Sequence, residues 1–141
     1  MIPILPPNGR VVAYVVGLEN YVRTGKIKPV DYARRDAQAF AEALSIAFPD
    51  WEVDVTTRID DEATLSALRF ELPSTIAGLR DDDLFVFYFA GHGLFGEGGN
   101  RLTAYDRYSA NLNETTWLVR ELLTDPRFRR QRGRTAKPHN R

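Results

Sequence analysis

The stretch that decides the fold reads LFVFYFAGHG and runs from Leu84 to Gly93. Its first seven residues are all apolar, which is typical of a strand buried on both faces. The two glycines around His92 then end the apolar run and begin a turn. We therefore predict a central strand over residues 84–90, with His92 just beyond its carboxyl end.

Two further strands are expected earlier in the chain. A continuous apolar run over residues 11–17 predicts a strand that is also buried on both faces. Apolar and polar residues alternate over residues 51–56, which predicts a half-buried strand near a sheet edge.

Helical periodicity separates these strands. Apolar and small residues recur every three or four positions from Ala33 to Ala47, and leucine and isoleucine do so from Leu65 to Leu79. The acidic residues 60–62 favour the start of the second helix, through capping and the helix dipole. We expect one helix after each of the first two strands.

The region after His92 is expected to hold a hairpin and a last helix. Residues 96–100 are rich in glycine, and with residues 101–106 they predict a small hairpin. Thr115 or Thr116 is expected to cap a helix that carries the apolar residues of 117–123. No periodicity follows Asp125.

This order of elements predicts an α/β fold with a mainly parallel sheet. Strand, helix, strand, helix, strand, helix is the pattern of a three-layer, Rossmann-like arrangement with right-handed crossovers and helices on both faces. We expect an N-terminal extension over residues 1–10, the domain over 11–124 and a disordered tail over 125–141. Sheets of this kind bind ligands at the carboxyl ends of their strands, where His92 is expected.

The charge is divided unevenly along the chain. The 141 residues carry 19 basic and 19 acidic side chains, but seven of the basic ones and one acid lie in residues 125–141. The other 124 residues therefore hold 12 basic and 18 acidic side chains. The tail is short and matches no nucleic-acid motif, so we expect no nucleic-acid partner. It differs in composition from the rest, as if the reading frame had changed near Pro126.

Composition excludes several kinds of site. The sequence has no cysteine and two histidines, His92 and His139, so it offers no thiol nucleophile, and we expect no metal and no cofactor. The three aspartates 81–83 are expected to be solvated. No apolar run reaches the roughly 18 residues of a membrane span. The proline-rich residues 1–7 do not form a secretory signal, so we expect a cytoplasmic protein without membrane contact.

His92 is the candidate catalytic residue. A histidine acts as a general base when one ring nitrogen faces the reaction and a neighbour orients the other. The amide of Gly93, which no side chain obstructs, is a candidate donor to an oxyanion. Gly91 and Gly93 permit positive φ angles around the histidine. Glu97 or Asp106 would lie on the same side and orient the imidazole, with simple solvation of both acids as the competing interpretation.

Residues 83–93 resemble the histidine-bearing strand of the caspase and metacaspase superfamily of cysteine peptidases. Residues 12–21 resemble the family's first strand and its G-x-x-x-Y loop, and residues 35–37 are similar to the N-D-A helix of metacaspases. The resemblance runs from about Arg10 to Leu123, the front part of a caspase domain. Two shorter pieces are also similar to the family: Glu62-Ala63-Thr64 and Tyr105-Asp106.

The resemblance implies a caspase-like fold and a histidine–cysteine dyad that hydrolyses peptide bonds. His92 matches the family histidine, and Gly93 matches the residue whose amide helps to form the oxyanion hole. Asp36 matches an acidic residue of the substrate pocket, which in metacaspases receives a basic side chain. Ala90 stands where metacaspases tend to carry a serine. The family thiolate lies on the next strand, which ends in D-x-C.

That next strand has no counterpart here, because residues 127–134 read RFRRQRGR and no cysteine exists. The first hypothesis is therefore a cysteine endopeptidase segment, truncated or frame-disrupted and inactive alone, whose substrates are peptides or proteins. The second is a pseudoenzyme, a non-catalytic caspase-like module that binds a partner protein or a second copy at the open edge of its third strand. A nucleotide-binding Rossmann domain is disfavoured, because no G-x-G-x-x-G turn follows the first strand.

Overall fold

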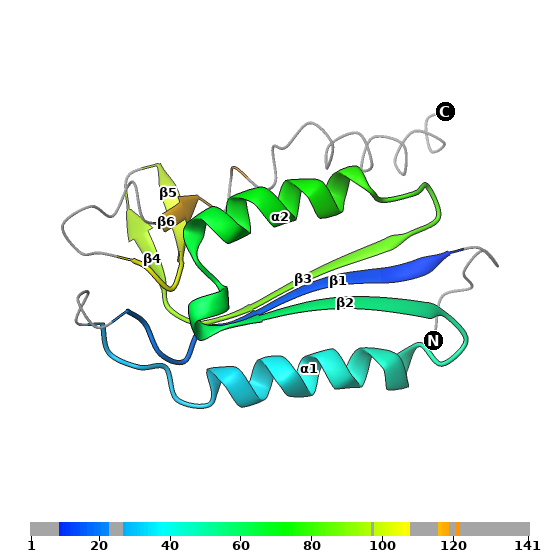
Figure 1. The fold of residues 1–141 in the computed structure, drawn as a ribbon, viewed down its shortest axis with the longest axis horizontal. Coiled ribbons are helices and arrows are strands. Elements are labelled where there is room, and N and C mark those ends of the chain that lie inside the picture. The colour runs from blue at the N-terminus through cyan, green and yellow to red at the C-terminus, as the bar shows by residue number, and fades with distance from the viewer. Residues whose placement is uncertain (1–8, 23–26, 97, 108–115, 119–120, 122–141) are drawn as a thin grey trace.

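A computed structural model gives the fold of the chain in residues 9–22, 27–96, 98–107, 116–118 and 121 (Figure 1). Residues 1–8 of the predicted N-terminal extension and the whole predicted tail lie outside the described residues. The elements are β1 (Arg10–Gly17), α1 (Ala33–Ala47), β2 (Glu52–Ile59), the short 3₁₀ helix η2 (Asp60–Glu62), α2 (Leu65–Ala77), β3 (Leu84–Ala90), β4 (Gly93–Gly96), β5 (Gly99–Thr103) and β6 (Thr116–Leu118).

The first three strands form a parallel sheet in the order β2-β1-β3, which confirms the predicted α/β class. At its carboxyl end, Gly17 lies opposite Ile59 on one side and Ala90 on the other. The predicted strand over residues 84–90 is confirmed as β3. Its predicted central place is wrong, because β1 is the middle strand of the described sheet. Apolar side chains on both faces of a strand show that both faces are covered. They do not show that both edges are paired.

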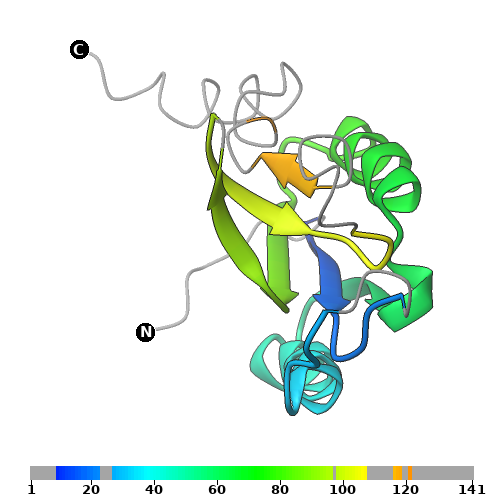
Figure 2. The same ribbon diagram turned by 90° about the vertical axis from the view of Figure 1, so that its left-hand side faces the viewer.

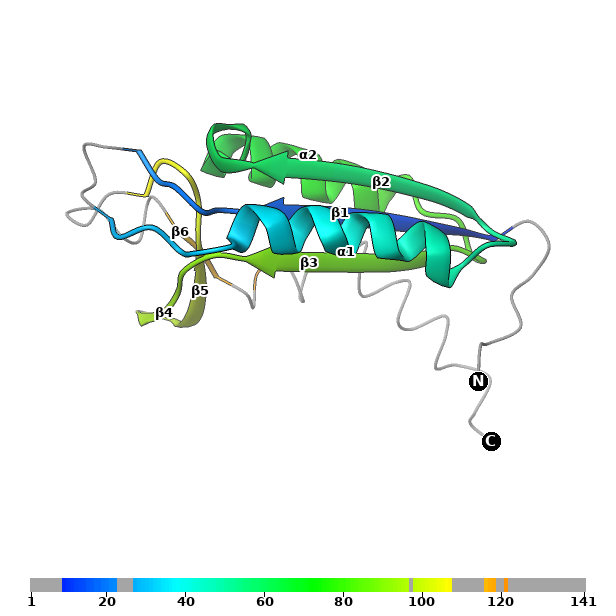
Figure 3. The same ribbon diagram turned by 90° about the horizontal axis from the view of Figure 1, so that it is seen from below.

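Helices cover both faces of the sheet, as predicted. Figure 3 shows α1 in front of the three strands, and Figure 1 shows α2 on the opposite side. Side chains of β1 alternate between the two layers, because successive residues of a strand point to opposite faces. Ala13 and Val15 pack in one buried cluster with Ala37 and Leu44. The cluster on the other face contains Tyr14, Val16, Leu65, Leu68, Leu72 and Ile76.

Helix α2 begins later than the acidic residues predict. Its N-cap is Thr64, whose Oγ1 accepts a hydrogen bond from the amide of Ala67 at 3.3 Å. Residues 60–62 form η2 instead, and β2 extends up to this turn. Asp60 adopts a left-handed φ of 49°, which is incompatible with the first turn of an α-helix. The expected helix start at residues 60–62 is therefore wrong.

The predicted hairpin is confirmed, and it belongs to a second sheet. Strands β4 and β5 pair antiparallel, with Gly96 opposite Gly99, and β6 pairs antiparallel with β5. The expected helix from Thr115 or Thr116 is wrong over residues 116–118, because Trp117 is buried in the core as part of β6. Glu121 is helical, and residues 119–120 and 122–123 lie outside the described residues.

An ion pair between Arg10 and Asp83 lies at the amino end of the parallel sheet. The Asp83 side chain is fully buried and accepts hydrogen bonds from Arg10 Nε at 3.0 Å and from the amide of Arg80 at 2.8 Å. The expectation of a solvated carboxylate is thus wrong for Asp83, because the Arg10 guanidinium compensates its burial. This contact lies at the far end of β3 from His92. No helix in the described part of the chain is long and apolar enough to cross a membrane.

Candidate functional site

His92 lies directly beyond the carboxyl end of β3, where the small β4-β5-β6 sheet adjoins the parallel sheet (Figures 1 and 2). The chain that leaves β1 passes the same place. The amide of Leu18 donates to the carbonyl of Ala90 at 2.8 Å, and that of Val22 donates to the carbonyl of Tyr105 at 3.0 Å. The topology therefore brings three loops together around His92.

A main-chain carbonyl orients the imidazole of His92. Its Nε2 atom lies 2.6 Å from the carbonyl oxygen of Lys28. Because a carbonyl oxygen can only accept a hydrogen bond, Nε2 carries the proton in this arrangement. In the neutral ring Nδ1 then holds the lone pair. The geometry thus makes Nδ1 the basic atom of His92.

Tyr21 packs against the same imidazole from inside the protein. The two ring centroids lie 5.4 Å apart at an interplanar angle of 34°, and Tyr21 is 7% exposed. Burial raises the pKa of the Tyr21 phenol above its ordinary value of 10.0. The phenol therefore remains protonated near neutral pH and acts as both donor and acceptor.

Three hydrogen bonds close a ring around the main chain of His92. Its amide donates to the Tyr21 hydroxyl at 2.8 Å, and its carbonyl accepts from Thr103 Oγ1 at 2.7 Å. The Tyr21 and Thr103 hydroxyls lie 2.7 Å apart. Since the Thr103 proton is engaged by the carbonyl, the Tyr21 hydroxyl donates to Thr103. Each group in the ring is thereby satisfied, as buried polar groups require.

Gly91, the residue before His92, serves packing rather than an unusual backbone angle. A Cβ atom on Gly91 would lie 2.9 Å from the Tyr21 hydroxyl and 3.1 Å from Leu18 Cβ. A side chain there would force the Tyr21 hydroxyl or the Gly91 backbone to shift. Among the described glycines, positive φ angles occur at residues 98 and 99, so the positive φ considered at Gly91 and Gly93 is not adopted.

The amide of Gly93 points away from β5. Gly93 lies opposite Leu102, while the amide of Thr103 donates to the carbonyl of His92 at 3.3 Å. Antiparallel pairs alternate between bonded and non-bonded, so Gly93 and Leu102 form a non-bonded pair. The Gly93 amide is therefore directed away from β5, so the ladder does not occupy it and it is available as a donor to an oxyanion.

Asp36 lies in the first turn of α1, which begins at the carboxyl end of the sheet (Figure 3). Its side chain is exposed, and its amide donates to the carbonyl of Tyr32 at 2.8 Å. Asp36 is thus at the same end of the sheet as His92. The hydrogen bonds of His92 itself are made to Lys28, Tyr21 and Thr103.

Two acids were considered as partners of the imidazole, and the structure describes one of them, Asp106. Asp106 Oδ1 accepts from the amide of Leu65 at 3.0 Å, so this carboxylate binds the start of α2. Glu97 lies outside the described residues. Sequence reasoning missed the Lys28 carbonyl, because a main-chain acceptor has no residue signature. Tyr21 could have been found, since a tyrosine in a loop next to a buried strand needs a polar partner.

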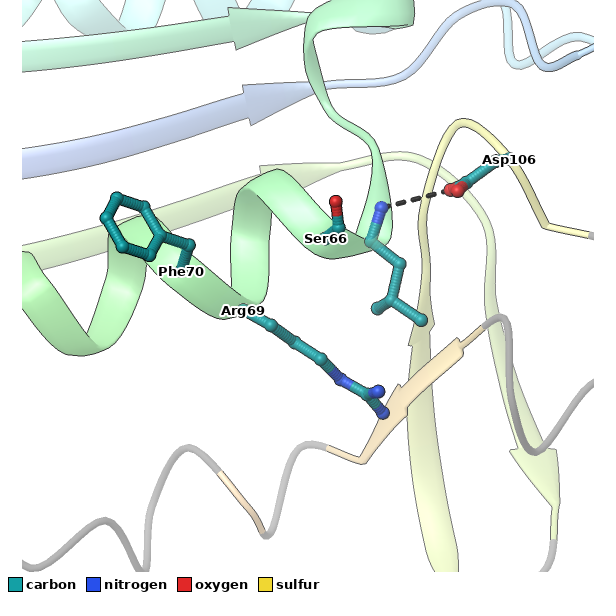
Figure 4. Close-up of a pocket in the computed structure, with 5 residues that line it drawn as sticks. Ser66, Arg69, Phe70 and Asp106 are labelled. Carbon is teal, nitrogen blue, oxygen red and sulfur yellow. Dashed lines mark hydrogen bonds between the residues drawn. The ribbon is translucent and has the colours of Figure 1, made fainter.

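A pocket of about 540 Å³ lies at the start of α2 (Figure 4). His92 is not among its lining residues, and Asp106 in its wall already binds the helix start. The pocket is therefore separate from the site at His92. It is lined by Leu65, Ser66, Arg69, Phe70 and Asp106.

Comparison with known proteins gives one family match in the chain. A family model described as a caspase domain matches residues 10–132. The matched range includes His92, Gly93 and Asp36. No curated protein matches the chain.

Proposed function

Because the chain belongs to the caspase domain family, we propose that it is the histidine-bearing part of a cysteine endopeptidase in which His92 is the general base. Family membership supports a peptide or protein as the substrate or partner. The chemistry would be peptide-bond hydrolysis by a histidine–cysteine dyad. We also propose that the protein is of metacaspase type and that it is cytoplasmic.

The observation that carries this proposal is the 2.6 Å hydrogen bond from His92 Nε2 to the Lys28 carbonyl. It leaves Nδ1 to take the proton of a thiol, which gives a thiolate and an imidazolium. The Lys28 carbonyl stabilises the imidazolium, because Nε2 still donates to it. The thiolate then attacks the carbonyl carbon of the substrate, and the Gly93 amide donates to the oxyanion.

The remaining steps use the same two nitrogen atoms. Imidazolium Nδ1 returns its proton to the leaving amine as the peptide C–N bond breaks, which leaves a thioester. A water molecule then gives a proton to Nδ1 as its oxygen attacks the thioester carbon. The C–S bond breaks, the carboxylic acid product leaves, and Nδ1 returns the proton to the thiolate. Asp36, exposed at the same end of the sheet, would contact a basic substrate side chain.

The thiol must come from residues outside this sequence, which contains no cysteine. We propose that the chain is inactive by itself. Of the two edges of β3, one pairs with β1, and the described residues provide no strand for the other. A strand parallel to β3 at that edge would end beside His92, because parallel strands share their carboxyl ends.

The same edge supports the second candidate, a non-catalytic module that binds a partner protein. Unpaired strand edges recruit extended segments through main-chain hydrogen bonds. The two candidates predict the same binding event and differ in the chemistry after binding. In the first, the incoming strand carries a thiol that His92 activates.

Addition of a thiol-bearing strand distinguishes the two candidates. The probe is a synthetic peptide of valine and isoleucine residues that ends in Asp-Ala-Cys and carries lysines for solubility. Cleavage of fluorogenic peptides is measured with the chain alone, with the probe alone and with both. We expect activity only with both, and loss of this activity in His92→Ala and with a serine probe.

Three other outcomes are informative. Binding of the probe without cleavage favours the non-catalytic module. Cleavage that persists in His92→Ala contradicts the role of His92. Failure of the cysteine probe to bind contradicts recruitment at β3 and thereby both candidates.

A further inference from the structure

The loop that holds the Lys28 carbonyl is attached to the protein at both ends. We call residues 18–22 and 27–34 the His92 strap, because Lys28 within it orients the imidazole. The strap follows β1 and ends in the first turn of α1. Lys28 and Pro29 are exposed, so packing of their side chains does not fix the carbonyl.

One carboxylate, that of Asp60, binds both ends of the strap. Its Oδ1 atom accepts from the amides of Glu19 at 2.9 Å and Asn20 at 3.0 Å. Its Oδ2 atom accepts from the Arg34 guanidinium at 2.6 Å. Asp60 lies in η2, directly after β2, so it is anchored to the parallel sheet from outside the strap.

Glu19 continues this connection toward Lys28. Its carbonyl accepts from the amide of Val30 at 2.9 Å, and its Oε1 accepts from the amide of Arg34 at 3.2 Å. Val30 is two residues beyond Lys28. A continuous series of contacts therefore leads from Asp60 through Glu19 and Val30 to the carbonyl that receives His92 Nε2.

The local conformation of Asp60 is unusual and costs free energy. A φ of 49° is unfavourable for residues with a Cβ atom, although aspartate tolerates it better than most. The Asp60 side chain is 14% exposed. Burial alone would raise the pKa of its carboxyl group, but hydrogen bonds from Asn20, Arg34 and Glu19 outweigh burial and lower it. The group is thus ionised at neutral pH and binds three donors.

We propose that Asp60 is a positioning residue of the His92 site, which holds both ends of the strap so that the Lys28 carbonyl accepts from His92 Nε2. This inference rests on the proposed role of His92. An ordinary surface ion pair would contribute little stability and would not affect a histidine in another loop. Asp60 differs because its carboxylate binds two main-chain amides at one end of the strap and the Arg34 side chain at the other end.

The experiment measures solvent exchange of the His92 Nε2 proton by NMR on the ¹⁵N-labelled full chain. The chain has two histidines, and His92→Asn identifies the signal. In the wild type, the proton held by Lys28 should give a protected downfield signal. We expect Asp60→Ala to accelerate its exchange at least tenfold, and Arg34→Gln to do so severalfold.

Asp61→Ala is the matched control, because it removes an exposed carboxylate from the same turn. It should leave the exchange rate unchanged, and amide shifts of β1 and β3 report that each variant is folded. An unchanged rate in folded Asp60→Ala would overturn the inference. If Asp60→Ala does not fold, an unchanged rate in Arg34→Gln overturns it.

The two proposals fail in different ways. A wild-type chain without a protected Nε2 signal contradicts the orientation of His92, and with it the proposed function. A protected wild-type signal that is insensitive to the Asp60 and Arg34 variants leaves His92 in place and rejects the role of Asp60.

Discussion

The hydroxyl groups of Tyr21 and Thr103 lie 2.7 Å apart and together hold the main chain of His92 from its amide to its carbonyl. The two residues are 82 positions apart in sequence. They link the loop after β1 to the end of β5, with His92 between them. The position of the histidine therefore depends on the joining of the two sheets.

Removal of either hydroxyl should destabilise the fold. Tyr21→Phe leaves the His92 amide without an acceptor and Thr103 Oγ1 without its donor, at a cost of about 1–3 kcal/mol in the free energy of unfolding. Thr103→Val should have a similar effect, and the double variant should cost less than the sum, because the three bonds form one ring. Urea denaturation measures all three values.

The exposed Tyr32 provides the control for this cycle, since Tyr32→Phe should change the unfolding free energy by less than about 0.5 kcal/mol. Strict additivity of the Tyr21 and Thr103 variants would show that the two hydroxyls act independently.

The two glycines beside His92 should respond differently to the same substitution. Gly91→Ala places a Cβ atom 2.9 Å from the Tyr21 hydroxyl and should destabilise by about 1–3 kcal/mol. At Gly93 the nearest atom, the Arg101 carbonyl oxygen, is 3.7 Å away, which is an ordinary contact. Gly93→Ala should therefore be nearly neutral in thermal unfolding. Equal melting temperatures for the two variants would contradict the packing described for Gly91.

A buried leucine tests the α2 face of the core. Leu72 is fully buried in α2, and Leu72→Ala should cost about 2–5 kcal/mol because it leaves a cavity. Phe70, in the same helix, is 74% exposed, and Phe70→Ala should cost far less. A larger loss of unfolding free energy in Phe70→Ala than in Leu72→Ala, measured by urea denaturation, would contradict the packing of the Leu72 face of α2 against the sheet.

Acid should weaken the contact between α2 and the sheet through Glu71. Arg58 donates to Glu71 from Nε at 2.8 Å and from its terminal nitrogen at 3.1 Å, and Tyr14 donates at 2.6 Å. The hydrogen bonds from Arg58, and secondarily from Tyr14, lower the pKa of the Glu71 carboxyl group. A lowered pKa in the folded state means that the stabilisation exists above about pH 4.5, the ordinary value, and is lost as the pH falls.

The measurement is the free energy of unfolding from pH 7 to pH 3 in the wild type and in Glu71→Gln. The variant should lose less stability on acidification than the wild type. If the unfolding free energy falls equally with pH in the two proteins, the Glu71 carboxyl group has the same pKa in the folded and unfolded chain.

The sequence was sufficient for the elements that carry a periodic apolar pattern. Strands β1 and β3 are continuous apolar runs, and α1 and α2 repeat apolar residues at helical spacing, so local patterns determine them. Strand β6 could not be found in this way. Its three residues are a strand because they pair with β5 and bury Trp117, and these contacts are distant in sequence.

The sequence was enough to predict His92 as the candidate site residue. It was not enough to predict the groups that orient His92. His92 stood out because it follows an apolar strand and lies between glycines. The Lys28 carbonyl is a main-chain atom that any residue could supply. The left-handed conformation of Asp60, which directs its carboxylate to the strap, arises from the turn after β2 and gives no pattern in the sequence. The role of the Lys28 carbonyl and that of Asp60 can therefore be recognised only from the tertiary contacts.

The most direct test of the central claim is the ¹⁵N spectrum of the His92 ring in the wild-type chain, recorded while the ring is neutral. We predict a proton on Nε2, held by Lys28, and a bare Nδ1 that is available to a thiol. A proton fixed on Nδ1 would contradict this assignment, because the nitrogen identified as the base would then have no lone pair to use.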